Sequence, residues 1–186
     1  MIHKPDHREL SNYKLDKQYK YVVNYRSLEF FNSDAGIEHY SLLAWFSHQY
    51  PKGSLLIEVG TLDGCGMLAL SHNQDNRVIS WDVHRYGDIC NLPPNTEARL
   101  VTENYMDTVM PTVMQAPFIF YDAKHEGKEE REFLDELVKR NWHGIVMWDD
   151  IHLNKPMKQF WNSITQEKED WTDIGHFCGT GIVHLK

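Results

Sequence analysis

The sequence is poor in cysteine, in positive charge and in long apolar runs. Its three cysteines, Cys65, Cys90 and Cys178, are widely spaced and form no C-x-x-C pair, which argues against a disulfide framework or a zinc knuckle. No apolar run approaches the ~20 residues that span a bilayer, and the first residues are polar, so neither a membrane span nor an export signal is expected. These absences predict a soluble, cytoplasmic protein in a reducing compartment.

The balance of charge limits the kinds of partner. Asp and Glu number 27 against 19 Lys and Arg, which gives a formal net charge of −8. This charge would repel a phosphate backbone unless a local basic patch offset it, so nucleic acid is not expected as a partner. At 186 residues and 41% hydrophobic content, the chain has enough apolar sequence for one substantial core, which favours one domain over two.

Four short apolar runs alternate with segments that are compatible with helices. The runs cover residues 55–59, 78–81, 117–121 and 145–148. Before them, apolar positions recur at helical spacing over 37–50, and Pro51 ends that helix. Strands that are apolar on both faces and separated by helices indicate an α/β fold, with a mostly parallel sheet covered by helices on both faces. The expected sheet core is Leu56, Val59, Ile79, Ile119 and Val146.

The two ends of the chain differ from this pattern. Residues 1–36 are polar with scattered aromatic side chains, and they predict an irregular arm laid over the domain 37–186 or over a second copy in a possible homodimer. At the other end, the strand-like runs 172–177 and 180–185 meet at Cys178-Gly179, which predicts a closing antiparallel hairpin. The segment 176–181 is therefore interpreted as hairpin geometry rather than as part of a catalytic site.

A glycine-rich turn follows the first strand. From Gly60 its spacing is G-x-x-x-G-x-G, and Asp82 ends the second strand about 22 residues later. Glycines let a ligand approach the backbone closely, the next helix offers free N–H groups, and an acid at the place of Asp82 can bind ribose hydroxyls. Dinucleotides favour G-x-G-x-x-G, so a nicotinamide-dependent oxidoreductase is a weaker alternative. The other alternative is a tight turn without a ligand, in a cofactor-free binding module.

The stretch Glu58-Val-Gly60-Thr61-x-x-Gly64 resembles the first motif of class I S-adenosylmethionine-dependent methyltransferases, especially the small-molecule O-methyltransferases. The resemblance implies a Rossmann-like fold, with a central, mostly parallel seven-stranded sheet and a C-terminal antiparallel hairpin. It also implies that the acid and the glycines hold the methionine end of S-adenosyl-L-methionine, and that Asp82 holds its ribose. The implied cofactor-binding residues are Glu58, Gly60, Thr61, Gly64, Asp82, Asn104 and Asp122.

Three aspartates follow two later strands. Asp122 comes after the run 117–121, and Asp149 and Asp150 come after 145–148. In a parallel sheet these carboxylates gather at one rim, where they repel one another unless a cation, a proton or several donors offset them, and oxygen ligands suit Mg²⁺. Such an ion lowers the pKa of an acceptor hydroxyl and orients it. Alternatively, Asp149 and Asp150 cap the helix that begins near Asn154.

The pattern Asp122-x-x-His125 with Asp149-Asp150 resembles the metal-dependent O-methyltransferases, and is closer to the antibiotic-sugar branch, exemplified by macrocin O-methyltransferase, than to the catechol branch. The resemblance implies that the three aspartates bind Mg²⁺ or Mn²⁺. His125 stands where the catechol branch has a lysine base. Because a histidine with an ordinary pKa of ~6.5 accepts protons at neutral pH, His125 is the expected base, beside Asp122.

The predicted function is therefore O-methylation of a small-molecule hydroxyl. Family likeness favours a sugar, such as a deoxyhexose in a glycan, with a catechol or phenol as the alternative acceptor. A nucleic-acid amino methyltransferase would carry Asn or Asp, Pro-Pro and an aromatic residue after the fourth strand, where this sequence reads Asp122-Ala-Lys124. Lys124 and His152 are alternatives to His125 as the base. The chain lacks much of the substrate-covering segment of the antibiotic-sugar enzymes, so the arm, the 83–96 loop or a second subunit must enclose the acceptor.

Overall fold

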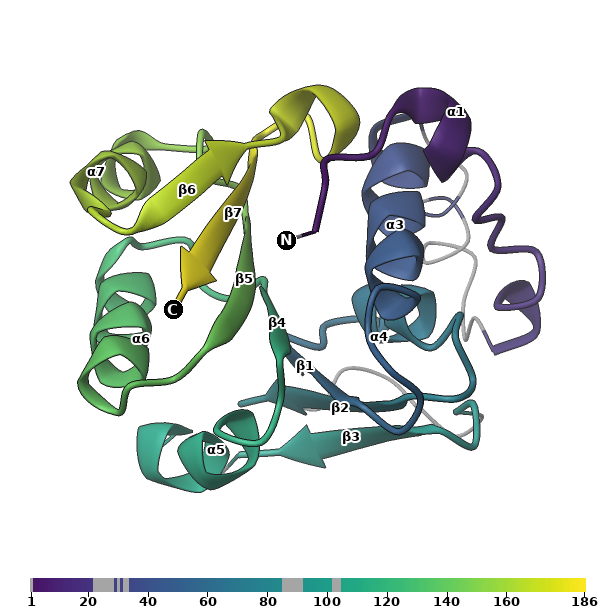
Figure 1. Cartoon of the computed structure of the whole chain (residues 1–186), viewed down its shortest axis with the longest axis horizontal. Coiled ribbons are helices and arrows are strands. Elements are labelled where there is room, and N and C mark those ends of the chain that lie inside the picture. The colour runs from purple at the N-terminus through teal and green to yellow at the C-terminus, as the bar shows by residue number, and fades with distance from the viewer. Residues whose placement is uncertain (1, 22–28, 30, 32–33, 85–91, 102–104) are drawn as a thin grey trace.

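A seven-stranded sheet runs through the molecule, with helices packed on both of its faces (Figure 1). The structure is a computed structural model, and it describes residues 2–21, 29, 31, 34–84, 92–101 and 105–186. The strand order is β3-β2-β1-β4-β5-β7-β6, and all strands are parallel except β7, which is antiparallel to both its neighbours. The strands are β1 Leu55–Val59, β2 Arg77–Asp82, β3 Thr96–Leu100, β4 Phe118–Tyr121, β5 Gly144–Asp149, β6 Glu167–Asp170 and β7 Thr180–Leu185.

The helices divide between the two faces of the sheet. Because alternate residues of a strand point to opposite faces, Leu56 packs in one core and Ile57 in the other. Figure 1 shows the two groups of helices on opposite sides of the sheet. The Leu56 side holds α1 (His7–Leu10), α3 (Asp34–Ser47) and α4 (Cys65–Leu70), and the Ile57 side holds α5 (Tyr105–Val113), α6 (Lys128–Lys139) and α7 (Lys155–Ser163).

Within the described residues, no helix has the length and apolar character needed to span a bilayer.

The observed sheet confirms the predicted fold class, a mostly parallel α/β sheet that closes in an antiparallel hairpin. The four predicted runs agree with β1, β2, β4 and β5 to within one residue at each end. The five predicted core residues are at most 2% exposed. Two edge strands carried no apolar run in the sequence, because β3 reads Thr-Glu-Ala-Arg-Leu and β6 reads Glu-Lys-Glu-Asp and both leave many side chains exposed.

The amino-terminal segment is more ordered than the sequence suggested. It contains the one-turn helix α1, which Asp6 caps by accepting from the Glu9 N–H, and the 3₁₀ turn η1 (Tyr19–Tyr21). Helix α3 begins at Asp34 and ends at Ser47, three residues earlier at each end than expected, so it crosses the predicted boundary at 36/37. Leu10 is buried in the core on the α3 face, so this part of the arm lies over the domain.

The closing hairpin exists, but its first strand is not the predicted one. Strand β6 covers 167–170 instead of 172–177, and the connection to β7 contains the 3₁₀ turn η2 (Thr172–Ile174). The sequence misled because a buried apolar side chain, Ile174, lies within this connection and packs in the core without belonging to a strand. The segment that ends at Gly179 is therefore a long connection between β6 and β7. It approaches the carboxyl ends of the parallel strands near Asp149 and Asp150, where His152 N donates to Cys178 O.

Phe46 tests the packing of α3 on the sheet. Its ring is fully buried and stacks on Phe118 of β4, with centroids 4.7 Å apart, and on Trp171. We expect Phe46→Ala to lower the free energy of unfolding by about 3–5 kcal/mol in chemical denaturation, because it leaves a cavity between helix and sheet. Phe177→Ala is the matched control, since Phe177 is 69% exposed, and it should change stability by less than about 0.5 kcal/mol. Equal effects of the two variants would contradict the packing described here.

Candidate functional site

The glycine turn after β1 brings two parts of the site into contact. Gly60 has a φ of +98°, and a Cβ at this position would lie 1.7 Å from the backbone oxygen of Asp122. The backbone of Asp122 is fixed in turn, because its N–H donates to Val59 O at 2.8 Å. Only glycine fits this conformation and this approach, so Gly60 places the turn directly beside the start of the loop after β4.

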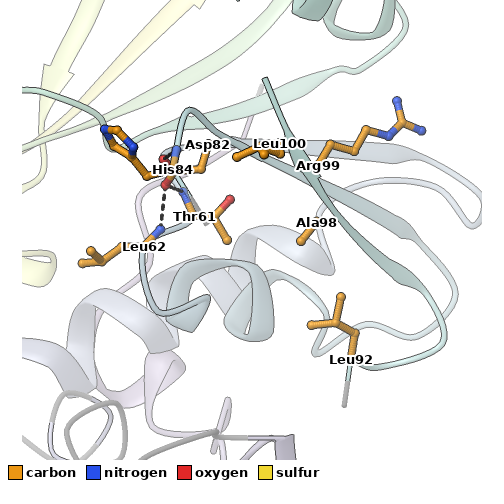
Figure 2. A pocket seen from close by; sticks show the side chains of 8 residues that line it. All are labelled: Thr61, Leu62, Asp82, His84, Leu92, Ala98, Arg99 and Leu100. Carbon is orange, nitrogen blue, oxygen red and sulfur yellow. Dashed lines mark hydrogen bonds between the residues drawn. The ribbon is translucent and has the colours of Figure 1, made fainter. Parts of the chain in front are cut away.

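Asp82, the last residue of β2, holds the turn by its backbone. Its Oδ2 accepts from the N–H groups of Thr61 and Leu62, both at 2.9 Å, and its Oδ1 accepts from His84 N–H at 2.9 Å (Figure 2). These bonds use three acceptor positions of a carboxylate that offers about four. Asp82 thus shapes the turn and still has acceptor capacity toward the cavity that it lines.

Glu58 lies buried behind the turn. The Ser80 hydroxyl donates to its Oε2, and Thr61 Oγ1 lies 2.6 Å from Ser80 Oγ. Burial raises the pKa of the Glu58 carboxyl well above its usual range; the Ser80 hydrogen bond opposes this, and the charges of Asp122 and Asp82 add to it. A Cβ on Gly66 would lie 2.0 Å from Glu58 Oε1, so this glycine makes room for the carboxyl.

Three cavities surround the turn, and Leu62 lines all of them. The first, of about 270 Å³, lies between Asp82 and β3 and is shown in Figure 2. The second, of about 390 Å³, contains Glu58, Gly60 and the acidic cluster. The third, of about 470 Å³, extends from Asp82 to the loop after β4. Gly60, Thr61 and Asp82 each line two of these spaces, whereas Gly64, the N-cap residue of α4 with a φ of +81°, lines none of them.

The structure brings the predicted aspartates together with His125. His125 Nε2 lies 3.2 Å from Asp122 Oδ1 and 3.6 Å from Asp150 Oδ2. Ligand atoms of Asp122, His125 and Asp149 all lie within 4.8 Å of one another. Burial alone would lower the pKa of His125, but the carboxylates of Asp122, Asp150 and Glu130 together outweigh it, so the pKa of this imidazole is raised above its ordinary value.

The loop that carries His125 is held from two helices. The His125 N–H donates to Glu130 Oε1 at 2.9 Å, and its carbonyl accepts from Asn154 Nδ2 at 2.8 Å. Asn154 also caps α7, by accepting from Met157 N–H. The alternative in which the two aspartates cap this helix is therefore wrong: Asp149 is the last residue of β5, and the cap is Asn154 itself.

Two histidines of the site were not predicted. His176, from the connection before β7, places Nδ1 2.9 Å from Asp150 Oδ1 and 3.8 Å from Asp149 Oδ1. His39 of α3 lies beneath them, with Nδ1 3.7 Å from Asp149 Oδ1. Burial, reinforced by His176, lowers the pKa of His39 to about 3, so its ring is neutral. His176 belongs to the segment interpreted as hairpin geometry, and no local motif marks His39.

The remaining predicted residues lie at the edges of the site or outside the described part of the chain. Asn104 falls outside the described residues, as does Cys90. Lys124 pairs with Glu129 at the surface, where both residues line the third cavity. His152 pairs with Asp170 at 2.7 Å and does not line any of the three cavities. The geometry therefore favours His125 over Lys124 and His152 as the group closest to the aspartates.

The donor set fits a bound divalent cation. Asp149 Oδ1 is buried and accepts no hydrogen bond from the described residues, although Asp149 lines the second cavity. Burial raises the pKa of Asp149 well above its usual range, and the Asp122 and Asp150 carboxylates raise it further. A cation would satisfy the free oxygen and offset this repulsion.

Comparisons with known proteins reveal likeness at the level of structure. No family model and no curated protein matches the sequence. A Staphylococcus aureus protein described as a caffeoyl-CoA O-methyltransferase superposes with a TM-score of 0.56 at 12% identity, over 79% of this chain and 82% of that one. The Mg-SAM structure of cmcI gives 0.52 at 11% identity, over 79% and 72%. Fibrillarin, in its complex with Nop5p, gives 0.51 at 10% identity, over 76% and 78%.

These likenesses establish the fold. The seven-stranded, mostly parallel sheet with its antiparallel β7 superposes on methyltransferase structures over about three quarters of the chain or more, at TM-scores of 0.51 to 0.56. The glycine turn and the acidic cluster lie at the carboxyl ends of the parallel strands, where open α/β sheets bind their ligands. The chain thus has the class I methyltransferase fold, with the candidate site at the expected edge of the sheet.

The buried carboxyl of Glu58 predicts a pH-dependent cost to stability. A carboxyl whose folded pKa lies above its ordinary 4.5 stabilises the fold when protonated, and this contribution is lost as the pH rises from 4.5 through the folded value. We therefore expect Glu58→Gln to unfold at higher denaturant concentration than wild type at neutral pH, with the gain vanishing below pH 4.5. The control is Glu132→Gln, on an exposed helix face. Parallel stability profiles of wild type and Glu58→Gln would contradict the raised pKa.

Proposed function

We propose that the protein is an S-adenosylmethionine-dependent O-methyltransferase that acts on a small-molecule hydroxyl, with a sugar as the favoured acceptor. The observation that carries this proposal is the contact of Gly60 with Asp122, which joins a cofactor-type turn to a cluster of acids and histidines around adjoining cavities. Two structural neighbours support the proposal: one is described as an O-methyltransferase, and the other is a Mg-SAM structure.

Residues of the turn would hold the cofactor. Asp82 has free acceptor capacity toward ribose hydroxyls, and Glu58 offers a buried carboxylate to the cationic amino group of the methionine end. A cationic partner would offset the charge that burial makes costly for Glu58. S-adenosyl-L-methionine supplies a methyl group on a positively charged sulfur. The chain's own contribution is to orient that group toward the acidic cluster.

The aspartates would hold the cation and His125 would accept the proton. Asp122, Asp149 and Asp150 offer oxygen ligands for Mg²⁺ or Mn²⁺, which would lower the pKa of an acceptor hydroxyl beside it. His125 would take the hydroxyl proton at Nε2, and the Asp122 carboxylate beside this nitrogen would stabilise the imidazolium that forms. The acceptor oxygen, freed of its proton, would then take the methyl group, and the cofactor sulfur would keep the electron pair of the broken bond.

The rim of the second cavity favours a ring-shaped acceptor. Phe177 is 69% exposed and lines this cavity, so its face is available for packing against a sugar or an aryl ring. A catechol or phenol is therefore the alternative acceptor. The net charge of −8 disfavours nucleic acid. A second subunit in a homodimer could help to cover the cavity, as could the arm.

Asp82 provides the first test of this function. Asp82→Ala should weaken binding of S-adenosylhomocysteine at least about tenfold, ~1.4 kcal/mol, because it removes the ribose acceptor and releases the turn. Isothermal titration calorimetry measures the affinity, and circular dichroism checks the fold. Asp75→Ala is the control, since Asp75 is exposed and pairs only with Lys52 among the charged groups of the described chain. Unchanged affinity in Asp82→Ala would remove this assignment.

Transfer of a labelled methyl group tests class, acceptor and cation together. Wild type is incubated with labelled S-adenosyl-L-methionine and a panel of sugars, glycans, catechols and an RNA oligonucleotide, with Mg²⁺, with Mn²⁺ or with EDTA. We expect label on sugar hydroxyls and loss of turnover with EDTA. Asp149→Asn should abolish turnover while leaving S-adenosylhomocysteine affinity within about threefold, and Asp135→Asn, on the exposed face of α6, should retain both. Label on RNA alone, or full turnover with EDTA, would contradict the proposal.

A further inference from the structure

We infer that His176 is a metal ligand and that the cation site takes a first-row transition ion, such as Co²⁺ or Zn²⁺, in preference to Mg²⁺. The inference rests on the cation site of the proposed function and names the metal class for it. The three aspartates alone would form an all-oxygen site. His176, in the connection before β7, adds a ring nitrogen to these oxygen ligands. The sequence pattern of three aspartates contains no such nitrogen.

The distances place His176 within the ligand set. Its Nδ1 lies 2.9 Å from Asp150 Oδ1 and 3.8 Å from Asp149 Oδ1. Two ligands that each bind one ion at about 2.1 Å can be at most about 4.2 Å apart, so both pairs are compatible with a shared ion. His176 therefore shares a group of possible ligands with Asp150, beside the group formed by Asp122, His125 and Asp149.

An unsatisfied buried atom supports a ligand at this point. Asp149 Oδ1 accepts no hydrogen bond from the described residues, and the Asp149 side chain is only 8% exposed. The ring nitrogens of His39 and His176 lie 3.7 and 3.8 Å from this oxygen, beyond hydrogen-bonding distance. A buried carboxylate oxygen without a donor is costly, and an ion between Asp149 and His176 would satisfy it.

The ligand types determine which ions are favoured. Mg²⁺ prefers oxygen ligands and keeps several waters, whereas imidazole suits Zn²⁺, Cu²⁺, Fe²⁺ and Ni²⁺. Cys178 adds a sulfur, since ligand atoms of Asp150, His176 and Cys178 all lie within 4.8 Å of one another. Nitrogen beside carboxylate, with sulfur in reach, favours transition ions over Mg²⁺.

The backbone around His176 holds the ring in place. Its N–H donates to Thr180 Oγ1 at 2.8 Å, and its carbonyl accepts from Gly179 N–H at 2.9 Å. A Cβ on Gly175 would lie 2.2 Å from Thr180 Oγ1, so this glycine allows the connection to close on β7. These contacts involve only the backbone of His176, so its side chain can be replaced without removing them.

Metal binding to the full-length chain tests the inference without relying on activity. Protein freed of metal with EDTA is titrated with Co²⁺, Zn²⁺ or Mg²⁺ in a calorimeter, and Co²⁺ binding is followed in parallel by visible absorption. We expect wild type to bind Co²⁺ and Zn²⁺ at least tenfold more tightly than Mg²⁺. His176→Gln should weaken Co²⁺ binding at least tenfold and change its spectrum, while Mg²⁺ affinity changes less than threefold.

Two further variants separate ligation from structure. Asp150→Asn removes an oxygen ligand and should weaken Co²⁺ and Mg²⁺ alike. His143→Gln, at the opposite end of β5, should change neither. Equal affinity of wild type for Co²⁺ and Mg²⁺, or an unchanged Co²⁺ affinity and spectrum in His176→Gln, would overturn the inference. The affinity for S-adenosylhomocysteine is measured on the same samples. If S-adenosylhomocysteine binds but the protein does not prefer Co²⁺ to Mg²⁺, only the inference fails. If the protein prefers Co²⁺ but does not bind S-adenosylhomocysteine, the proposed function fails.

Discussion

The close approach of Gly60 to the backbone of Asp122 is the contact on which the rest of the site depends. It requires a glycine with positive φ at the end of β1, and it sets the end of β4 directly against the turn. Asp82 then holds the turn from β2, and β5 delivers Asp149 beside Asp122. A cofactor-type turn and an acidic cluster that are far apart in the sequence thus share one wall.

The site concentrates buried acids that the fold does not fully neutralise. Glu58 and Asp149 both have pKa values raised by burial, and the nearest basic groups to Asp149 include the neutral His39. Buried acids that lack a cationic partner lower the stability of the folded protein, and a bound positively charged ligand raises it. Under the proposed function, binding of the cofactor and of the metal ion would therefore contribute to folding as well as to chemistry.

Most of the sheet could be predicted from the sequence, and about half of the site could. Buried parallel strands such as β1 and β4 are continuous apolar runs, and the acids at their ends follow from topology. The edge strands β3 and β6 could not be found, because pairing on one side leaves their polar residues in solvent. His39 and His176 were missed for another reason: α3 and the β7 connection approach the aspartates only through tertiary packing, and neither residue lies at a strand end.

Leu62 has a consequence for the evolution of ligand preference. Its side chain is 49% exposed, its φ is +42°, and it borders all three cavities around the turn. A substitution there would reshape three compartments at once, whereas Phe177 borders only the second of them. Under the proposed function, adaptation to a new acceptor would thus be less constrained at Phe177 than at Leu62, and specificity would diverge along the β7 connection while the turn stays the same.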